Sequence, residues 1–174
     1  MAHVWLRLVD EGDADFILSL RMNADKSRYM SSVDSDLELQ VQWLRQYRQR
    51  EIEGREYYFI IESYDSGMLG TVRVYGFEGD AFSWGSWMLK TGSPHYAAIE
   101  SALAVYEFSF DFLKFERSYF EVRKDNERVI EFHKRSGAQV SNMDDVNVYF
   151  SYEAKEYAGF KNRYSKFFGN QISK

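Results

Sequence analysis

The residues best suited to binding an anion lie in one stretch of the chain, between Ser93 and Gly137. A loop, Lys90-Thr91-Gly92-Ser93-Pro94-His95-Tyr96-Ala97-Ala98, leads into it, and a helical pattern begins at Ile99. A loop that opens a helix beside a sheet presents unpaired backbone N–H groups at the positive end of the helix dipole. Phosphate is the usual ligand of such a position. The stretch therefore predicts a site for a phosphate or pyrophosphate group.

The chain has no cysteine and three histidines, His3, His95 and His133. A chain without a thiol has no disulfide, thiolate metal site or cysteine nucleophile, and so few histidines argue against a histidine-rich metal site. His133 has an ordinary pKa of about 6.5, so both of its protonation states are available near neutral pH. It is either a proton donor or a helix-surface residue without a chemical role, and the sequence favours neither.

Length and composition set the class of protein. The chain has 174 residues, of which 45% are apolar and 18% aromatic, which is enough for one domain with a sizeable core. The net charge of -5 argues against nucleic-acid binding. No apolar run approaches the roughly 20 residues that span a bilayer, and the N-terminus passes directly into a strand pattern, without a signal peptide. We expect a cytoplasmic protein with no nucleic-acid or membrane partner.

A sheet and its helices must position the candidate residues. The expected strands cover residues 4–9, 57–62, 69–75, 81–89, 117–122, 138–141 and 146–151. The expected helices cover residues 14–21, 37–53, 99–113, 127–135 and 153–168, and residues 26–32 are expected to be irregular. Asp13 is a candidate N-cap for the first helix, and Gly54 ends the second. A glycine inside a strand, Gly85, predicts a bulge or the close approach of a ligand.

The order of these elements predicts the fold class. A strand, two helices, three antiparallel-type strands, and then alternating helices and strands give an α/β (α+β) domain. The central sheet should be mixed and mostly antiparallel, with helices on its faces. The sequence shows no repeat and no linker, so residues 1–174 are expected to form a single domain.

The most specific motif is Val122-Arg123-Lys124-Asp125-Asn126-Glu127-Arg128-Val129-Ile130-Glu131-Phe132-His133-Lys134-Arg135-Ser136-Gly137. It resembles the strand–Asn–helix–Gly signature of the GCN5-related N-acetyltransferase (GNAT) superfamily. The resemblance implies that two strands separate here and that the pantetheine arm of acetyl-CoA enters the gap. Asn126 would then cap the helix while its backbone faces the cofactor. It also implies an enzyme that transfers an acetyl group directly to an amine.

The front and the tail of the chain narrow the resemblance. Arg21-Met22-Asn23, a helix carrying Trp43, and Tyr57-Tyr58-Phe59-Ile60-Ile61 are similar to bacterial enzymes that acetylate the amino group of nucleotide-linked sugars. The tail, Val148-Tyr149-Phe150-Ser151-Tyr152, fits the same subgroup. The implied acceptor is a small-molecule amine, such as that of a sugar nucleotide. A polyamine, a protein N-terminus and a non-catalytic binding module are the alternatives, and the chain can form a homodimer.

The phosphate loop departs from the family pattern, Arg/Gln-x-x-Gly-x-Gly/Ala. Ser93 replaces the basic or amide residue and Tyr96 replaces the middle glycine, whereas Ala98 fits. A tyrosine adds bulk near the phosphate path. Either the loop bends differently, with Gly92 and Ser93 supplying N–H groups, or the cofactor binds weakly. Carried onto this sequence, the cofactor-binding candidates are Leu89, Lys90, Gly92, Ser93, Tyr96, Ala97, Ala98, Asn126 and Phe132.

Acetyl transfer needs a base for the amine, stabilisation of the carbonyl oxygen and an acid for the departing thiolate. His133 stands where the family often has the tyrosine that acts as this acid. Tyr149 and Tyr152 are the alternatives, and strand alternation should place them on opposite faces. Any one of the 13 tyrosines is more often structural.

Glu78 is the first candidate for the base, with Asp80 and Glu62 as alternatives that would relay a proton through water. Turn carboxylates are usually solvated surface groups. The substrate-binding candidates are Arg21, Asn23, Trp43 and Trp84. Arginine binds phosphate through its forked donors, and an aromatic ring can stack on a base or sugar. Core packing is the commoner role of the two tryptophans.

Overall fold

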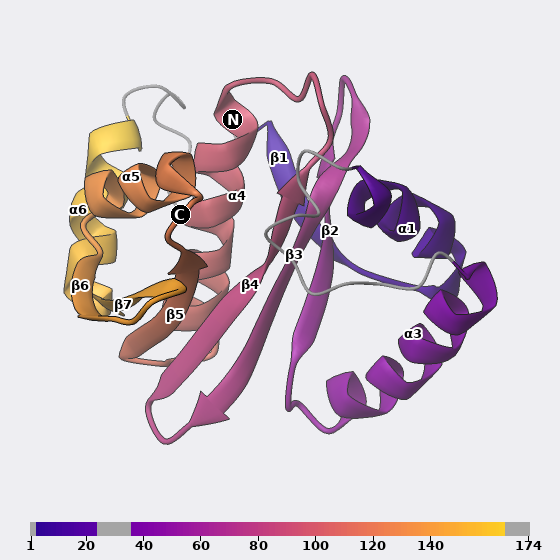
Figure 1. The fold of residues 1–174 in the computed structure, drawn as a ribbon, viewed down its shortest axis with the longest axis horizontal. Coiled ribbons are helices and arrows are strands. Elements are labelled where there is room, and N and C mark those ends of the chain that lie inside the picture. The colour runs from indigo at the N-terminus through magenta and orange to yellow at the C-terminus, as the bar shows by residue number, and fades with distance from the viewer. Residues whose placement is uncertain (1–2, 24–35, 166–174) are drawn as a thin grey trace.

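The computed structural model describes residues 3–23 and 36–165, which contain a seven-stranded mixed sheet (Figure 1). Its strands are β1 (Val4–Leu8), β2 (Tyr57–Ser63), β3 (Gly67–Glu78), β4 (Ala81–Leu89), β5 (Arg117–Arg123), β6 (Gln139–Met143) and β7 (Asn147–Glu153). They lie in the order β1-β2-β3-β4-β5-β7-β6. Neighbouring strands are antiparallel except β4 and β5, which are parallel. The predicted fold class is confirmed.

Helices cover both faces of the sheet. They are η1 (Glu11–Asp13), α1 (Ala14–Met22), α3 (Leu37–Ile52), α4 (Tyr96–Tyr106), the π-helical η2 (Glu107–Phe112), α5 (Glu127–Ser136) and α6 (Ala154–Ser165). Figure 1 shows α1 and α3 on one side of the sheet and α4, α5 and α6 on the other. The prediction for residues 26–32 and the end of the predicted tail helix, 166–168, lie outside the described residues.

Strand alternation in β2 builds a core on each face. Tyr58 and Ile60 pack in the cluster beneath α1 and α3, whereas Phe59 and Ile61 belong to the larger cluster beneath α4. Successive side chains of a strand point to opposite faces, so a continuous apolar run is what a sheet covered on both sides requires. The Tyr57–Ile61 run therefore explains why helices are found on both faces.

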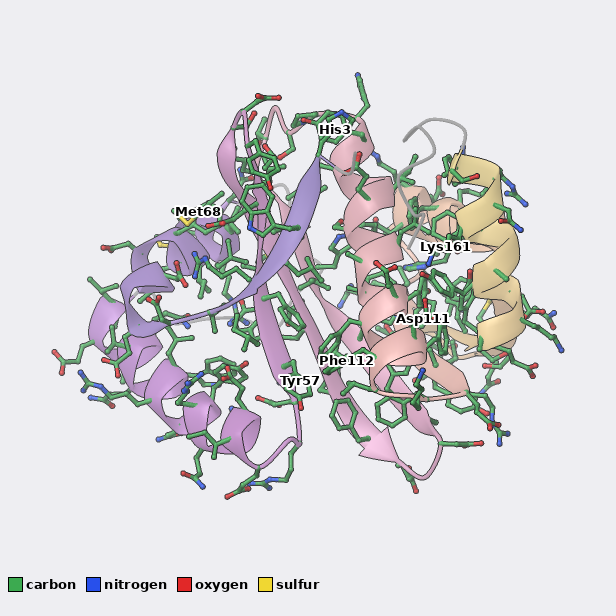
Figure 2. All side chains as sticks on the ribbon, turned by 180° about the vertical axis from the view of Figure 1, so that it is seen from behind. His3, Tyr57, Met68, Asp111, Phe112 and Lys161 are labelled. Atoms are coloured by element: carbon green, nitrogen blue, oxygen red, sulfur yellow. The ribbon has the colours of Figure 1, made fainter. Side chains whose placement is uncertain are left out.

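An ion pair attaches the tail helix to the central helix. Lys161 Nζ lies 3.1 Å from Glu107 Oε1 and 3.4 Å from Asp111 Oδ2. Figure 2 shows Lys161 and Asp111 facing each other between α6 and the helix that carries η2. This contact holds α6 beside α4 and encloses the aromatic core between them.

Strands β4 and β5 separate after a short pairing. Within the described residues they pair at Ala81–Arg117 and Phe82–Ser118, and their later residues are not paired to each other. The backbone groups that would have joined them are therefore available to a ligand. This is the separation that the Asn126 motif implied.

The β4 strand contains a bulge at Gly85, as its sequence predicted. Arg73 pairs with Gly85, but Thr71 pairs with Met88, so β4 has one residue more than β3 between these pairs. Ser86 has a φ of 48° there. The Thr71 hydroxyl donates to the Ser86 carbonyl oxygen at 3.1 Å and holds this conformation.

Most expected boundaries differ from the structure by a few residues, and two differences at helix starts have a clear physical reason. The central helix begins at Tyr96, three residues before the predicted Ile99, because Pro94 favours a first helical turn and its carbonyl accepts from Ala97 N at 3.0 Å. Asp13 makes no side-chain capping bond to α1. Its carboxylate instead binds both terminal nitrogens of Arg7 at 2.9 Å, and Asp10 caps the preceding turn.

Candidate active site

A cleft of about 810 Å³ opens where β4 and β5 separate. Its walls come from the second halves of these strands, the first turn of α4, the inner side of α5 and two β3 side chains. The described lining residues are Arg73, Tyr75, Trp84, Gly85, Ser86, Trp87, Met88, Leu89, Ala98, Phe120, Glu121, Val122, Arg123, Asn126, Arg128, Val129, Phe132, His133 and Asn147. The cleft thus passes through the sheet at the gap between the two strands.

The structure brings four of the predicted cofactor residues, Leu89, Ala98, Asn126 and Phe132, into this wall. The Asn126 side chain makes no capping hydrogen bond in the described structure, contrary to the sequence expectation; its backbone carbonyl accepts from Val129 and Ile130 at 3.1 Å. Its backbone N–H donates to the Arg123 carbonyl at 2.9 Å, so the side-chain amide is the part of Asn126 that no capping bond occupies.

The remaining cofactor candidates do not line the cleft. Ala97 is fully buried in the main core. Lys90 donates from Nζ to the Ser66 carbonyl at 3.2 Å, and Ser93 donates its N–H to the Lys90 carbonyl at 3.2 Å. The Ser93 N–H is thus already used within the loop. Gly92 adopts a φ of 82°, which turns the loop, and has open space around it.

Tyr96 does not obstruct the cleft. Its ring lies against His3, with centroids 4.6 Å apart, and packs on the main core. The expectation of added bulk on the phosphate path is corrected for this reason. Because the helix begins at Tyr96, the side chain at this position points to the β1 side, and the neighbouring Ala98 faces the cleft.

His133 lines the cleft but is 3% exposed. Aromatic rings surround it, those of Trp84, Trp87, Phe120, Phe132 and Phe150. Burial lowers the pKa of its imidazole to about 3, and Nδ1 has no hydrogen-bond partner among the described residues. The sequence expectation that both protonation states are available near neutral pH is therefore corrected: the ring is neutral there and does not act as an imidazolium acid.

The two alternative acids are also engaged elsewhere. The Tyr149 hydroxyl donates to Asp144 Oδ2 at 2.7 Å, and the residue is not part of the cleft wall. Tyr152 is 1% exposed, and its hydroxyl donates to the Ser136 carbonyl at 3.0 Å. Their predicted placement on opposite faces of β7 is correct, but neither hydroxyl reaches the cleft.

The predicted bases lie outside the cleft as well. Glu78 is exposed and pairs with Ala81, at the end of the sheet where β4 and β5 are still joined and the gap has not opened. Asp80 pairs with Arg117 at 2.6 Å and Glu62 with Arg7 at 3.1 Å. The first pair is exposed and the second is partly buried, and neither carboxylate lines the cleft.

Tyr75 and Glu121 are the acid–base candidates that the sequence analysis missed. Both line the cleft, Tyr75 from β3 and Glu121 from β5. Burial raises the pKa of the Tyr75 hydroxyl, and the Glu121 charge raises it further. Alternation along β3 places Tyr75 on the face of Arg73, but only the separation of β4 and β5 makes that face part of a cleft.

On the substrate side, Trp84 lines the cleft and Trp43 does not. Trp43 instead stacks on Tyr47, with centroids 5.8 Å apart. The Asn23 amide donates to Thr91 Oγ1 at 3.4 Å, which links the end of α1 to the phosphate loop. Arg21 is half-buried next to Arg73, whose charge acts on it. Three of the four predicted substrate residues, Arg21, Asn23 and Trp43, thus lie outside the cleft wall.

The cleft lining holds more arginines than carboxylates although the chain is acidic, and two of these arginines pair with carboxylates outside the lining, Arg73 with Glu56 and Arg123 with Asp125. The described lining contains Arg73, Arg123 and Arg128 against one carboxylate, Glu121. The described residues hold no group of three or more potential metal ligands. None of the helices among them has both the length and the apolar character needed to cross a bilayer. The arginines of the lining make the cleft suited to an anionic ligand.

Comparisons with known proteins agree with this geometry. A family model, the acetyltransferase (GNAT) domain, matches residues 3–139. Apo FdhC, a nucleotide-linked sugar GNAT, shares 44% sequence identity and a TM-score of 0.88, over 97% of this chain and 96% of that chain. A comparison with curated protein sequences found no match.

More distant structures share the fold alone. Spermidine N-acetyltransferase from Vibrio cholerae, in complex with CoA and spermine, has 14% identity and a TM-score of 0.74, covering 91% of this chain and 99% of that chain. The ribosomal-protein-S5-alanine acetyltransferase from Vibrio fischeri has 14% identity and a TM-score of 0.76, covering 90% and 96%.

Proposed function

The chain belongs to the GNAT family and is an N-acetyltransferase; on this premise we propose that it moves the acetyl group of acetyl-CoA directly to the primary amine of a nucleotide-linked amino sugar. The observation that carries the proposal is the charged cleft between the separated ends of β4 and β5. The relative FdhC, 44% identical, is itself a nucleotide-linked sugar GNAT. Residues 1–174 act as one domain in this proposal.

The separated strands fit the cofactor. Unpaired backbone along β4 and β5 can hydrogen-bond the amides of the pantetheine arm. The loop before α4 turns at Gly92, and the first N–H groups of α4 face a pyrophosphate at the positive end of the helix dipole. Ala98 offers a small side chain at that approach, and Asn126 and Phe132 border the arm on the α5 side.

Acetyl-CoA supplies the acetyl group as a thioester. The Glu121 carboxylate accepts, directly or through a water, the proton that the acceptor's ammonium must lose before nitrogen attacks the carbonyl carbon. The N–H groups at the β4 bulge stabilise the carbonyl oxygen as negative charge develops there. The Tyr75 hydroxyl donates a proton to the sulfur as the C–S bond breaks, and the resulting phenolate takes the second proton that the nitrogen loses on becoming an amide, while Glu121 releases the first to solvent. The raised pKa of Tyr75 keeps the hydroxyl protonated beforehand.

The charge of the cleft favours an anionic acceptor over a polyamine. Three arginines line it against one carboxylate in the described part of the chain. A polycation would meet like charges there, whereas the phosphates of a sugar nucleotide would meet complementary ones.

We also propose a homodimer. Every residue of the edge strand β6 is exposed, including Val140 and Met143, and Val146 next to it is also about half exposed. An exposed apolar strand edge can pair with a second copy of the chain.

Two measurements test the proposal. Calorimetric titration with acetyl-CoA should give saturable binding in the micromolar range, which is typical of enzyme substrates. The acetylation rate should be highest with TDP- or UDP-linked amino sugars, and low with spermidine or an alanine-ended peptide. Absence of cofactor binding at millimolar concentration, or a preference for spermidine or the peptide, would contradict it.

The same acetylation assay tests the proposed base. Glu121→Gln should be about 100-fold slower than wild type, the usual size of a general-base effect, and Glu78→Gln should be unchanged.

A further inference from the structure

Arg73 is a cleft arginine with part of its guanidinium unused. Its guanidinium lies over the rings of Trp43, Tyr58 and Tyr75, at 5.2, 5.9 and 5.0 Å from their centroids. One terminal nitrogen donates to Glu56 Oε2 at 2.9 Å, but its buried Nε has no hydrogen-bond partner among the described residues. Aromatic faces hold the guanidinium in one orientation and leave that donor free.

Arg21, at the end of α1, is in the same condition. Its Nε is buried and has no hydrogen-bond partner in the described structure. Burial lowers the pKa of its guanidinium, and the charge of Arg73 lowers it further. Helix α1, which carries Arg21, packs on β3, which carries Arg73, and each of the two arginines has a buried, unpaired Nε.

The local charge is not balanced by the described carboxylates. Glu56 is 7% exposed and is shared by two arginines, with Arg50 Nε and Arg73 Nη2 each 2.9 Å from one of its oxygens. Arg50 and Arg73 therefore share one buried carboxylate, and no ion pair of Arg21 is found among the described residues. Buried cations without partners are costly, and a guanidinium whose donors are free is suited to a phosphate.

We infer that Arg21 and Arg73 form the subsite for the diphosphate of the acceptor, on the α1/α3 face of the sheet. This inference rests on the proposed function for its substrate. Arg73 and Tyr75 lie two residues apart on one face of β3, a spacing of about 7 Å in a strand. The Arg73 guanidinium lies against the Tyr75 ring, so a sugar whose diphosphate binds at the arginines would lie beside this pair and present its amine to the Tyr75 hydroxyl and Glu121. The acceptor and the cofactor then have separate phosphate sites, on opposite faces of the gap.

The experiment titrates the protein, saturated with CoA, with UDP and TDP, and compares them with the uncharged nucleosides. CoA occupies the cofactor phosphate site, so any diphosphate binding reports on the second site. Arg21→Gln and Arg73→Gln should each weaken diphosphate binding by about tenfold, the loss expected for one charge-assisted hydrogen bond. CoA affinity should be unchanged. Arg73→Lys keeps the pair with Glu56 and should remain folded, yet should bind the diphosphate as weakly as Arg73→Gln because it lacks the fork.

Arg50→Gln is the matched control, because Arg50 also shares Glu56 and lies over Trp43 at 5.4 Å, but its Nε is already paired with Glu56 Oε1. It should change diphosphate affinity by less than about threefold, within the spread of ordinary surface charges. Equal affinities in wild type, Arg21→Gln and Arg73→Gln, an equal loss in Arg50→Gln, or no diphosphate binding at millimolar concentration would overturn the inference. Diphosphate binding that depends on the two arginines, without acetylation of any sugar nucleotide, would support the subsite and contradict the proposed function.

Discussion

The His133 ring is neutral at neutral pH because aromatic burial, rather than a charged neighbour, determines its protonation. Its pKa is about 3 in the folded protein and about 6.5 in an unfolded chain. Between these values the unfolded state binds a proton that the folded state does not. This contribution is therefore fully present above pH 6.5 and decreases as the pH falls toward 3.

His133→Phe should remove this acid sensitivity, since phenylalanine is apolar and the cage is aromatic. Between pH 7 and pH 4.5 the wild type should lose about 2–3 kcal/mol more of its free energy of unfolding than the variant, which follows from two pH units below the unfolded pKa. Urea unfolding at the two pH values measures the difference. Equal losses in both proteins would contradict a neutral, buried imidazole. The other titrating groups are common to both proteins and cancel.

The β4 strand combines a fixed register with a bulge that faces the cleft. Two glycines on β3 and β4 have different reasons for lacking a side chain. A Cβ at Gly70 would lie 2.0 Å from the Met88 carbonyl oxygen, which is backbone. A Cβ at Gly85 would lie 3.0 Å from the Tyr75 hydroxyl, which is the end of a side chain. One glycine is thus required by the strand pairing and the other by the position of Tyr75.

Substitution by alanine should separate these two requirements. Gly70→Ala should cost more than about 2 kcal/mol of the free energy of unfolding, because backbone must move. Gly85→Ala should stay within about 1 kcal/mol of wild type but reduce turnover, because the Tyr75 hydroxyl is displaced. Thermal unfolding and the acetylation rate give the two readings. A Gly70→Ala protein as stable as wild type would contradict the role of the Met88 carbonyl contact. A fully active Gly85→Ala protein would contradict the role of the Tyr75 hydroxyl contact.

At the scale of the whole molecule, Glu100 joins the first strand to the central helix. Its carboxylate accepts from His3 N at 2.7 Å, from Val4 N at 2.8 Å and contacts His3 Nδ1 at 2.8 Å. Figure 2 shows His3 at the end of α4 where that helix begins. The start of the chain is thus tied to the helix whose N-terminus is assigned to the cofactor.

Glu100→Gln should lower the free energy of unfolding by about 2 kcal/mol, because a buried carboxylate with two backbone donors becomes a neutral amide. Urea unfolding measures this loss. Glu107→Gln is the matched control on the same helix. Its exposed pair with Lys161 should contribute less than about 1 kcal/mol. Similar losses in the two variants would mean that Glu100 is no more than a surface charge.

Local patterns predicted the elements better than the site. Periodicity and turn residues placed the strands and most helices, and the Asn126 motif located the gap, because these depend on neighbours in sequence. Tyr75 and Glu121 come from strands that are not adjacent in sequence, so their meeting depends on which strands separate. The burial of His133 likewise depends on rings from β4, β5 and β7, which the α5 sequence does not contain.

The short pairing of β4 with β5 divides the sheet into a four-stranded and a three-stranded part, joined in the described residues by two residue pairs. The two parts of the sheet are held together by these pairs and by the helices that pack across the gap. A molecule that lies along the gap and hydrogen-bonds to the backbone of both β4 and β5 would join the two parts as an additional strand does. The midpoint temperature of thermal unfolding should therefore rise when the cofactor is bound.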